Sequence, residues 1–114
     1  PRTEVTVTAG PGVDDLPAAV EVAAYRIASE ALANVARHAS ARSARVSHDR
    51  TGPDLVVGVA DDGVGIAPDA VAGVGLVSLR ERAAELGGRC EVTCPPGGGT
   101  VVRAELPLDG GVHG

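Results

Sequence analysis

The hydrophobic periodicity of this chain switches repeatedly between a two-residue and a three-to-four-residue repeat, and this alternation limits the possible folds more than any other feature. Residues 4–9 alternate as a strand does, whereas apolar residues recur every three or four positions from 17 to 38, as in a helix. The same patterns predict strands at 44–50 and 54–60, a helix at 73–88 and two hairpin strands between 89 and 108. This order predicts an α+β fold: a two-layer α/β sandwich with helices on one face of a mixed, mainly antiparallel sheet.

Composition restricts the class of protein. The chain has 114 residues and a net charge of -5, and its ten basic residues are scattered arginines, which argues against a nucleic-acid surface. Tyr25 is the single aromatic residue, so Val, Leu, Ile and Ala must build the core. No apolar run approaches the roughly 20 residues of a membrane span, and no leader pattern is present. We expect a soluble, cytoplasmic, monomeric domain at 1–108 with a flexible tail at 109–114.

The absence of methionine favours a fragment of a longer protein over a chain whose initiator has been trimmed. It leaves open whether that parent is anchored in a membrane.

The two cysteines, Cys90 and Cys94, invite a disulfide or metal interpretation. The segment CEVTC alternates like a strand, which would hold the two Cα atoms about 13 Å apart on one face. A disulfide needs less than about 7 Å. We therefore expect two free, half-buried thiols in a reducing compartment.

Sixteen glycines gather largely where one element meets the next. Without a lysine the chain cannot form a Walker A loop, and no G-x-G-x-x-G opens its first strand–helix unit. Asp61 ends an apolar strand and is followed by Gly63 and Gly65. Such a carboxylate can accept a hydrogen bond from the exocyclic amine of adenine, while the glycines let the base lie against the backbone. An ordinary Asp-Gly turn is the alternative.

Four polar residues interrupt the alanine-rich helix in the stretch EALANVARHA. Glu30 and Asn34 are four residues apart, so their side chains lie on one helix face, with Arg37 and His38 a turn further on. An amide oxygen suits Mg²⁺, a carboxylate can hold a proton or a metal-bound water, and a guanidinium can meet phosphate oxygens. The set therefore fits Mg-ATP chemistry, with a solvated stripe of polar residues as the alternative.

Taken in order, these pieces resemble the catalytic, ATP-binding domain of sensor histidine kinases, within the superfamily that includes gyrase, heat-shock chaperone and mismatch-repair ATPases and shares the Bergerat ATP-binding fold. The resemblance covers residues from about 26 to 107. RIASEALANVARHA is similar to the N box, DDGVGI to the first glycine box, GVGL to the second and GGGT to the closing Gly-Thr motif. GVGLVSLRERAAELGG is similar to the pattern of the NarL-partnered subgroup, with a short ATP lid between Ile66 and Gly73.

The resemblance implies a role for each matching residue. Asn34 would coordinate Mg²⁺, Asp61 would recognise the adenine amine, and Thr100 would support Asp61 through water. Glu30 would be either a base or part of the metal shell. The remaining residues would shape the base pocket or face the phosphates: Gly63, Gly65, Gly73, Gly75, Leu76, Arg37 and His38.

The resemblance also implies partners. The γ-phosphoryl group would pass to a histidine in a separate dimerisation domain of the same parent, a homodimer, and then to a response regulator. No R-E-L-H-D-like acceptor motif occurs here, so the isolated chain should bind ATP without autophosphorylating.

Three rival functions stay open. An anti-sigma-factor serine kinase shares the E-x-x-x-N and D-x-G-x-G motifs, although it usually lacks the run seen at 80–88. The others are a nucleotide-binding switch without phosphotransfer and a gyrase-like hydrolase.

Overall fold

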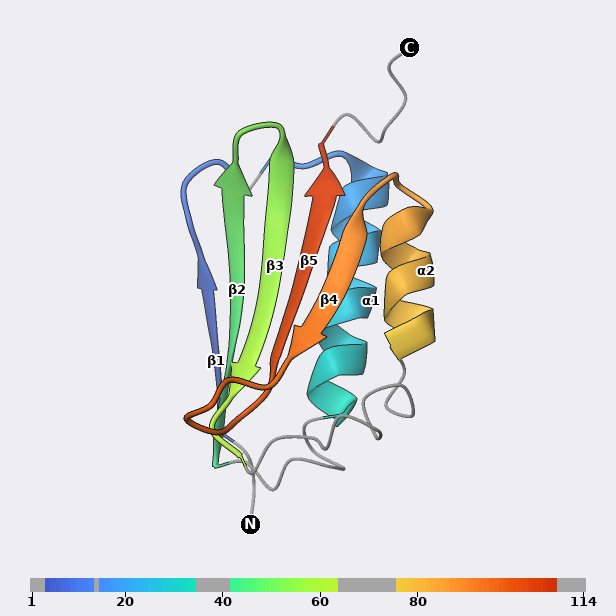
Figure 1. Cartoon of the computed structure of the whole chain (residues 1–114). Helices are drawn as coiled ribbons and strands as arrows, with labels where there is room; N and C mark the ends of the chain where they lie inside the picture. Colours follow the sequence, from blue (N-terminus) through green and yellow to red (C-terminus); the bar gives the residue numbers. More distant parts are fainter. Residues whose placement is uncertain (1–3, 14, 35–41, 64–75, 109–114) are drawn as a thin grey trace.

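The computed structural model describes residues 4–13, 15–34, 42–63 and 76–108. In these ranges two helices pack on one face of a five-stranded sheet (Figure 1). The elements are β1 (Glu4–Ala9), α1 (Ala18–Asn34), β2 (Ser43–Thr51), β3 (Asp54–Asp61), α2 (Leu76–Ala84), β4 (Arg89–Thr93) and β5 (Val101–Pro107). The predicted two-layer α+β sandwich and its order of elements are confirmed.

The sheet is mixed, with strand order β1-β2-β3-β5-β4. β1 runs parallel to β2, which α1 makes possible as the crossover, and the other three pairs are antiparallel. β3 is the central strand, and its Leu55, Val57 and Val59 are buried under the helices. The end of β3 is therefore held firmly from both sides.

Helix α1 begins where the sequence predicts. The carbonyl of Pro17 accepts the first helical hydrogen bond, from the Glu21 amide at 3.0 Å. Val20, Ala24 and Ile27 fall on one face and are buried, as the helical spacing of apolar residues requires. The described part of α1 ends at Asn34, and the last predicted residues, 35–38, lie outside the described residues.

Helix α2 is shorter than the predicted 73–88. Residues 73–75 lie outside the described residues, and the helix ends at Ala84 because a glycine cap turns the chain. Gly88 donates to the carbonyl of Ala83 at 2.9 Å and Gly87, with φ of 77°, donates to that of Ala84 at 2.9 Å. These bonds form a Schellman cap, so the predicted glycine stop is correct.

The core is aliphatic, as predicted, because Tyr25 is 73% exposed. Neither Cys90 nor Cys94, both among the described residues, is in a disulfide, also as predicted, but they differ in surroundings. Cys90 is buried on β4, where desolvation raises the pKa of its thiol to about 11. Cys94 is exposed because β4 ends at Thr93, so the expectation of two half-buried thiols on one strand was wrong.

Candidate functional site

The end of β3 presents a fixed carboxylate. The amide of Asp61 donates to the carbonyl of Thr100 at 3.0 Å, and its Oδ1 accepts from the amide of Gly63 at 2.8 Å. Its Oδ2 is buried and has no hydrogen-bond partner among the described residues. One carboxylate oxygen thus orients the group, and the other is left for an outside donor.

The loop before β5 brings a second polar group to this carboxylate. Thr100 is 3% exposed, and its Oγ1 is buried with no hydrogen-bond partner in the described part of the chain. Gly99 has a φ of 84°, and a Cβ there would collide with the carbonyl oxygen of Asp61. Only glycine lets the loop pass so close to the end of β3.

The end of α1 carries the other polar pair. Glu30 Oε1 accepts a hydrogen bond from Ser78 Oγ of α2 at 3.0 Å, while Glu30 Oε2 is buried and lacks a partner in the described ranges. Asn34, one turn further along, is 5% exposed. In both Glu30 and Asp61, therefore, one carboxylate oxygen accepts a hydrogen bond and the other has no partner within the described ranges.

These two groups share one end of the molecule. Figure 1 shows the end of α1, the end of β3 and the start of α2 at the same edge of the fold. Among the described residues, no three His, Cys, Asp or Glu side chains gather as a metal cluster. The arrangement suits a ligand that offers its own oxygens to a metal and its own donors to carboxylates.

A second acid, Asp62, fixes the neighbouring strand. Its Oδ1 accepts from the amides of Arg42 and Ser43, both at 2.9 Å, and its Oδ2 accepts from the Ser43 hydroxyl at 3.0 Å. These hydrogen bonds, those to Ser43 foremost, hold the pKa of the Asp62 carboxyl below its usual 3.8. Asp62 thereby ties the start of β2 to the end of β3.

Of the residues predicted for the site, the structure describes Glu30, Asn34, Asp61, Gly63 and Thr100. Leu76 begins α2, but its side chain is outside the description, as are Arg37, His38, Gly65, Gly73 and Gly75 altogether.

Sequence reasoning missed three residues: Ser78, Asp62 and Gly99. Asp62 and Gly99 stand inside motifs that were recognised, the first glycine box and the Gly-Thr motif. Ser78 gives no local signal, since its partner Glu30 is 48 residues away in the chain.

Comparison with known protein families shows which family the chain matches. Residues 19–110 match the family described as histidine kinase-, DNA gyrase B-, and HSP90-like ATPase. The chain belongs to this family.

Relatives narrow the class further. The chain is similar to the sensor histidine kinase LiaS of Bacillus subtilis strain 168, with 38% identity over 91 residues, 78% of this chain and 25% of LiaS. It is 39% identical over 90 residues to the sensor histidine kinase NarS of Mycobacterium tuberculosis, covering 74% of this chain and 21% of NarS. The chain thus spans about a quarter of the length of these curated relatives.

A solved structure agrees. The blue-light activated histidine kinase of Erythrobacter litoralis EL346 superposes with a TM-score of 0.74 at 30% identity, over 93% of this chain and 35% of that one. The chain is the ATP-binding catalytic domain of a sensor histidine kinase, with a Bergerat fold, and the recognition of this domain from its sequence motifs is confirmed. No helix among the described residues is both long and apolar enough to cross a membrane.

Proposed function

We propose that this domain binds Mg-ATP at the edge formed by α1, β3 and α2 and donates the γ-phosphoryl group to a histidine in a separate dimerisation domain of its parent. The parent, a homodimer, then passes the phosphoryl group to a response regulator. We place the domain, residues 1–108, in the cytoplasm, as a monomer when isolated and with 109–114 as a tail.

The observation that carries this proposal is the pair of buried oxygens at the end of β3 that have no hydrogen-bond partner among the described residues. Asp61 Oδ2 and Thr100 Oγ1 belong to residues joined by a 3.0 Å backbone hydrogen bond. A buried acceptor without a donor costs roughly 1–3 kcal/mol, so it calls for a ligand. The exocyclic amine of adenine supplies one donor to Asp61, and an ordered water can join Thr100 to the same carboxylate.

The phosphate end of the proposed site lies at the end of α1. Asn34 would give its amide oxygen to Mg²⁺, and Glu30, oriented by Ser78, would present Oε2 to the metal shell or to a proton. Bound Mg²⁺ would neutralise charge on the phosphates and so favour in-line transfer. Phosphate oxygens and waters would complete the coordination of Mg²⁺.

The remaining roles rest on the family motifs. Gly63 and Gly65 would shape the base pocket, while the amides of Gly73 and Gly75, with Leu76, would face the phosphates at the start of α2. Arg37 and His38 would contact phosphate oxygens.

Phosphotransfer in a mixed reaction tests the proposal. The chain is incubated with radiolabelled ATP, with or without the dimerisation domain of its parent, in Mg²⁺ or EDTA. We expect label on the acceptor histidine only in the complete mixture with Mg²⁺, and none on the chain alone. Label on a serine of a supplied partner, ATP binding without transfer, or steady hydrolysis by the chain alone would instead support one of the three rival functions.

Substitution of Asn34 tests the metal assignment. In Asn34→Ala we expect ATP binding to lose its dependence on Mg²⁺ because the amide ligand is gone, as calorimetry with and without EDTA would detect. Ser29→Ala, on the exposed side of α1, is the matched control. An unchanged Mg²⁺ dependence in Asn34→Ala would remove this residue from the site.

A further inference from the structure

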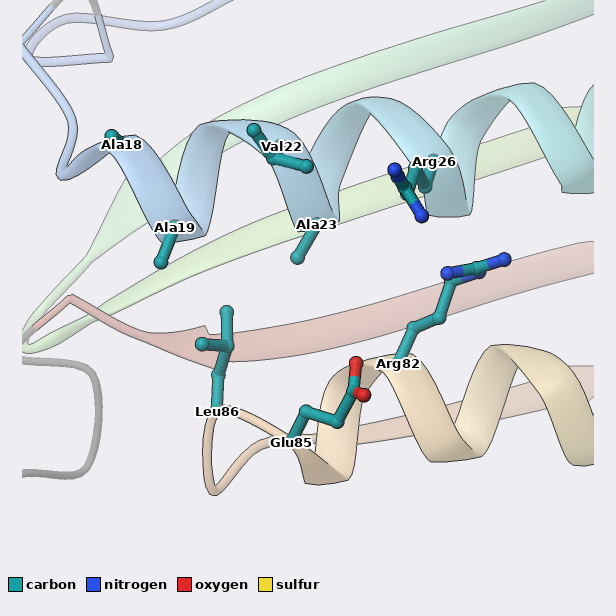
Figure 2. Close-up of a pocket in the computed structure, with 8 residues that line it drawn as sticks. All are labelled: Ala18, Ala19, Val22, Ala23, Arg26, Arg82, Glu85 and Leu86. Atoms are coloured by element: carbon teal, nitrogen blue, oxygen red, sulfur yellow. The ribbon is translucent and has the colours of Figure 1, made fainter.

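A mostly apolar groove runs between α1 and the end of α2, away from the carboxylates of the proposed ATP site. Figure 2 shows the first turns of α1 facing the last turn of α2 across it. Ala18, Val22 and Ala23 line one side, Leu86 lines the other, and the volume is about 440 Å³. Three polar side chains also line it, Arg26, Arg82 and Glu85, and Figure 2 shows the Glu85 carboxylate between Leu86 and Arg82.

The groove is too open to enclose a small molecule. Five of its eight lining residues are exposed, and one of these, Val22, is 52% exposed. Pockets for small ligands usually bury about 70–90% of the ligand surface. A shallow trough between two helices instead fits a third helix, and the alanines of α1 allow its backbone to come close.

Two arginines mark one end of this trough. Figure 2 shows the guanidinium groups of Arg26, on α1, and Arg82, on α2, at the same end. Neither forms an ion pair within the described part of the chain, although the whole sequence carries fifteen acidic residues. Arg82 Nε is also buried without a hydrogen-bond acceptor there. A buried donor of this kind calls for an acceptor from outside.

We propose that this groove docks an amphipathic helix of a partner protein, whose apolar face carries a carboxylate that pairs with Arg26 and Arg82. The net charge of -5 means that long-range attraction does not bring an acidic partner to this domain. The arginine pair therefore sets the register and specificity of docking, while apolar contact with Val22 and Leu86 supplies most of the affinity.

The docking groove and the proposed ATP site use the same two helices at successive turns. Arg26 precedes Glu30 by four residues on α1, and Arg82 follows Ser78 by four residues on α2. The docking proposal does not depend on the role of Glu30.

A peptide titration tests the proposal. The probe is a helical peptide with leucines at positions i, i+3, i+4 and i+7 and one glutamate beside this face, and a matched peptide carries glutamine instead. Binding to the chain is followed by amide chemical shifts. We expect shifts along the groove and at least tenfold tighter binding of the glutamate peptide.

Variants locate the contact. We expect Val22→Asp and Arg82→Gln each to weaken binding of the glutamate peptide at least tenfold. Arg82→Lys should lose less affinity than Arg82→Gln but should not match the natural chain, because lysine lacks the planar guanidinium that can bind a carboxylate through two N–H groups. Val77→Asp replaces a valine outside the groove that is 63% exposed, against 52% for Val22, and should leave peptide binding unchanged. Thermal melting verifies that each variant is folded.

The docking proposal would be overturned by equal affinity for the two peptides, by no binding at about millimolar peptide, or by shifts centred outside the groove. It would also be overturned if decanoate, a small carboxylate with an apolar tail, occupied the groove while the peptide did not. ATP affinity, measured on the same samples, reports separately on the proposed ATP site.

Discussion

At the scale of single residues, the proposed site contains two carboxylates, each with one oxygen held by a hydrogen bond within the protein. Asp61 is oriented by the Gly63 amide and Glu30 by the Ser78 hydroxyl. In each, the second oxygen is buried and has no partner among the described residues. Fixing a carboxylate before the ligand arrives reduces the entropy lost on binding.

Asp61→Asn tests base recognition. The substitution keeps the shape but replaces an anionic acceptor by an amide that can also donate, so adenine should lose a charge-assisted hydrogen bond of about 1.5–3 kcal/mol. We expect ATP and ADP to bind roughly 10- to 100-fold more weakly, with poorer discrimination against GTP, in calorimetric titrations. Asp54→Asn, at the other end of β3, is the control. Intact adenine selectivity in Asp61→Asn would refute the assignment.

Ser78→Ala tests how Glu30 is positioned. Removing the hydroxyl leaves Glu30 Oε1 without its donor, which should cost about 1 kcal/mol of stability and let the carboxylate turn. We expect phosphotransfer to the dimerisation domain to slow more than ATP affinity falls, as a comparison of rate with dissociation constant would reveal.

Rescue distinguishes positioning from simple destabilisation. Ser78→Thr restores the hydroxyl and should restore the rate, whereas Val77→Ala, at the exposed neighbour, should change neither. If Ser78→Thr stays as slow as Ser78→Ala while remaining folded, the hydroxyl does not position Glu30.

At the scale of elements, local pattern predicted what each segment becomes, but not which segments meet. Residues 54–60 are apolar on both faces, a pattern typical of a central strand, and β3 is central. That β3 pairs with β5 rather than with β4 depends on packing against α1 and α2, which no short window of sequence contains. Likewise, α2 ends earlier than its hydrophobic stripe because Gly87 and Gly88 form the cap.

The residues of the candidate site also fall into two groups, those that local sequence motifs predict and those that only the fold brings together. Asp61, Asn34 and Thr100 belong to motifs with fixed spacing, so the sequence predicted them. The Ser78–Glu30 bond and the clamp of Asp62 on Arg42 join residues 48 and 20 positions apart, and such pairs form only when the fold brings them together.

The loop between β4 and β5 supplies a prediction at this scale. Gly99→Ala puts a methyl group into the carbonyl of Asp61 at a backbone conformation that favours glycine, which should cost roughly 1–3 kcal/mol. Because the loop must move away from β3, we expect lower stability in chemical denaturation together with weaker ATP binding. Gly97→Ala, in the same loop with open space around it, should change the stability by less than about 0.5 kcal/mol. Equal effects of the two substitutions would contradict this close approach.

At the scale of the whole molecule, the helix pair divides the surface into two regions. One end of the pair meets the end of β3 and carries the proposed ATP site, and the α1–α2 groove lies toward the other end. The sheet is held by carboxylates that accept hydrogen bonds, as well as by its core. Asp62 ties β2 to β3, and Glu105 of β5 pairs with Arg89 of β4 at 2.6 Å.

The hydrogen bonds to these two carboxylates predict how stability depends on pH. Hydrogen bonds to Ser43 lower the pKa of Asp62 below 3.8, and hydrogen bonds to Arg89 and Arg103 lower that of Glu105 below 4.5. A carboxyl whose folded-state pKa is depressed stabilises the fold above its unfolded-state pKa and loses that contribution as pH falls through the folded-state value. We therefore expect the free energy of unfolding to be level near neutral pH and to decrease below about pH 4.5.

Denaturation curves between pH 7 and pH 2.5 check this dependence. Asp62→Asn should be less stable than the natural chain at pH 7, and the difference should shrink toward acid because protonation removes the same charge from the natural chain. Asp15→Asn, at an exposed carboxyl that makes no hydrogen bond or ion pair among the described residues, should follow the natural curve throughout. Parallel curves for Asp62→Asn and the natural chain at every pH would show that Asp62 does not contribute through its charge, and the link from β2 to β3 would then depend on backbone pairing alone.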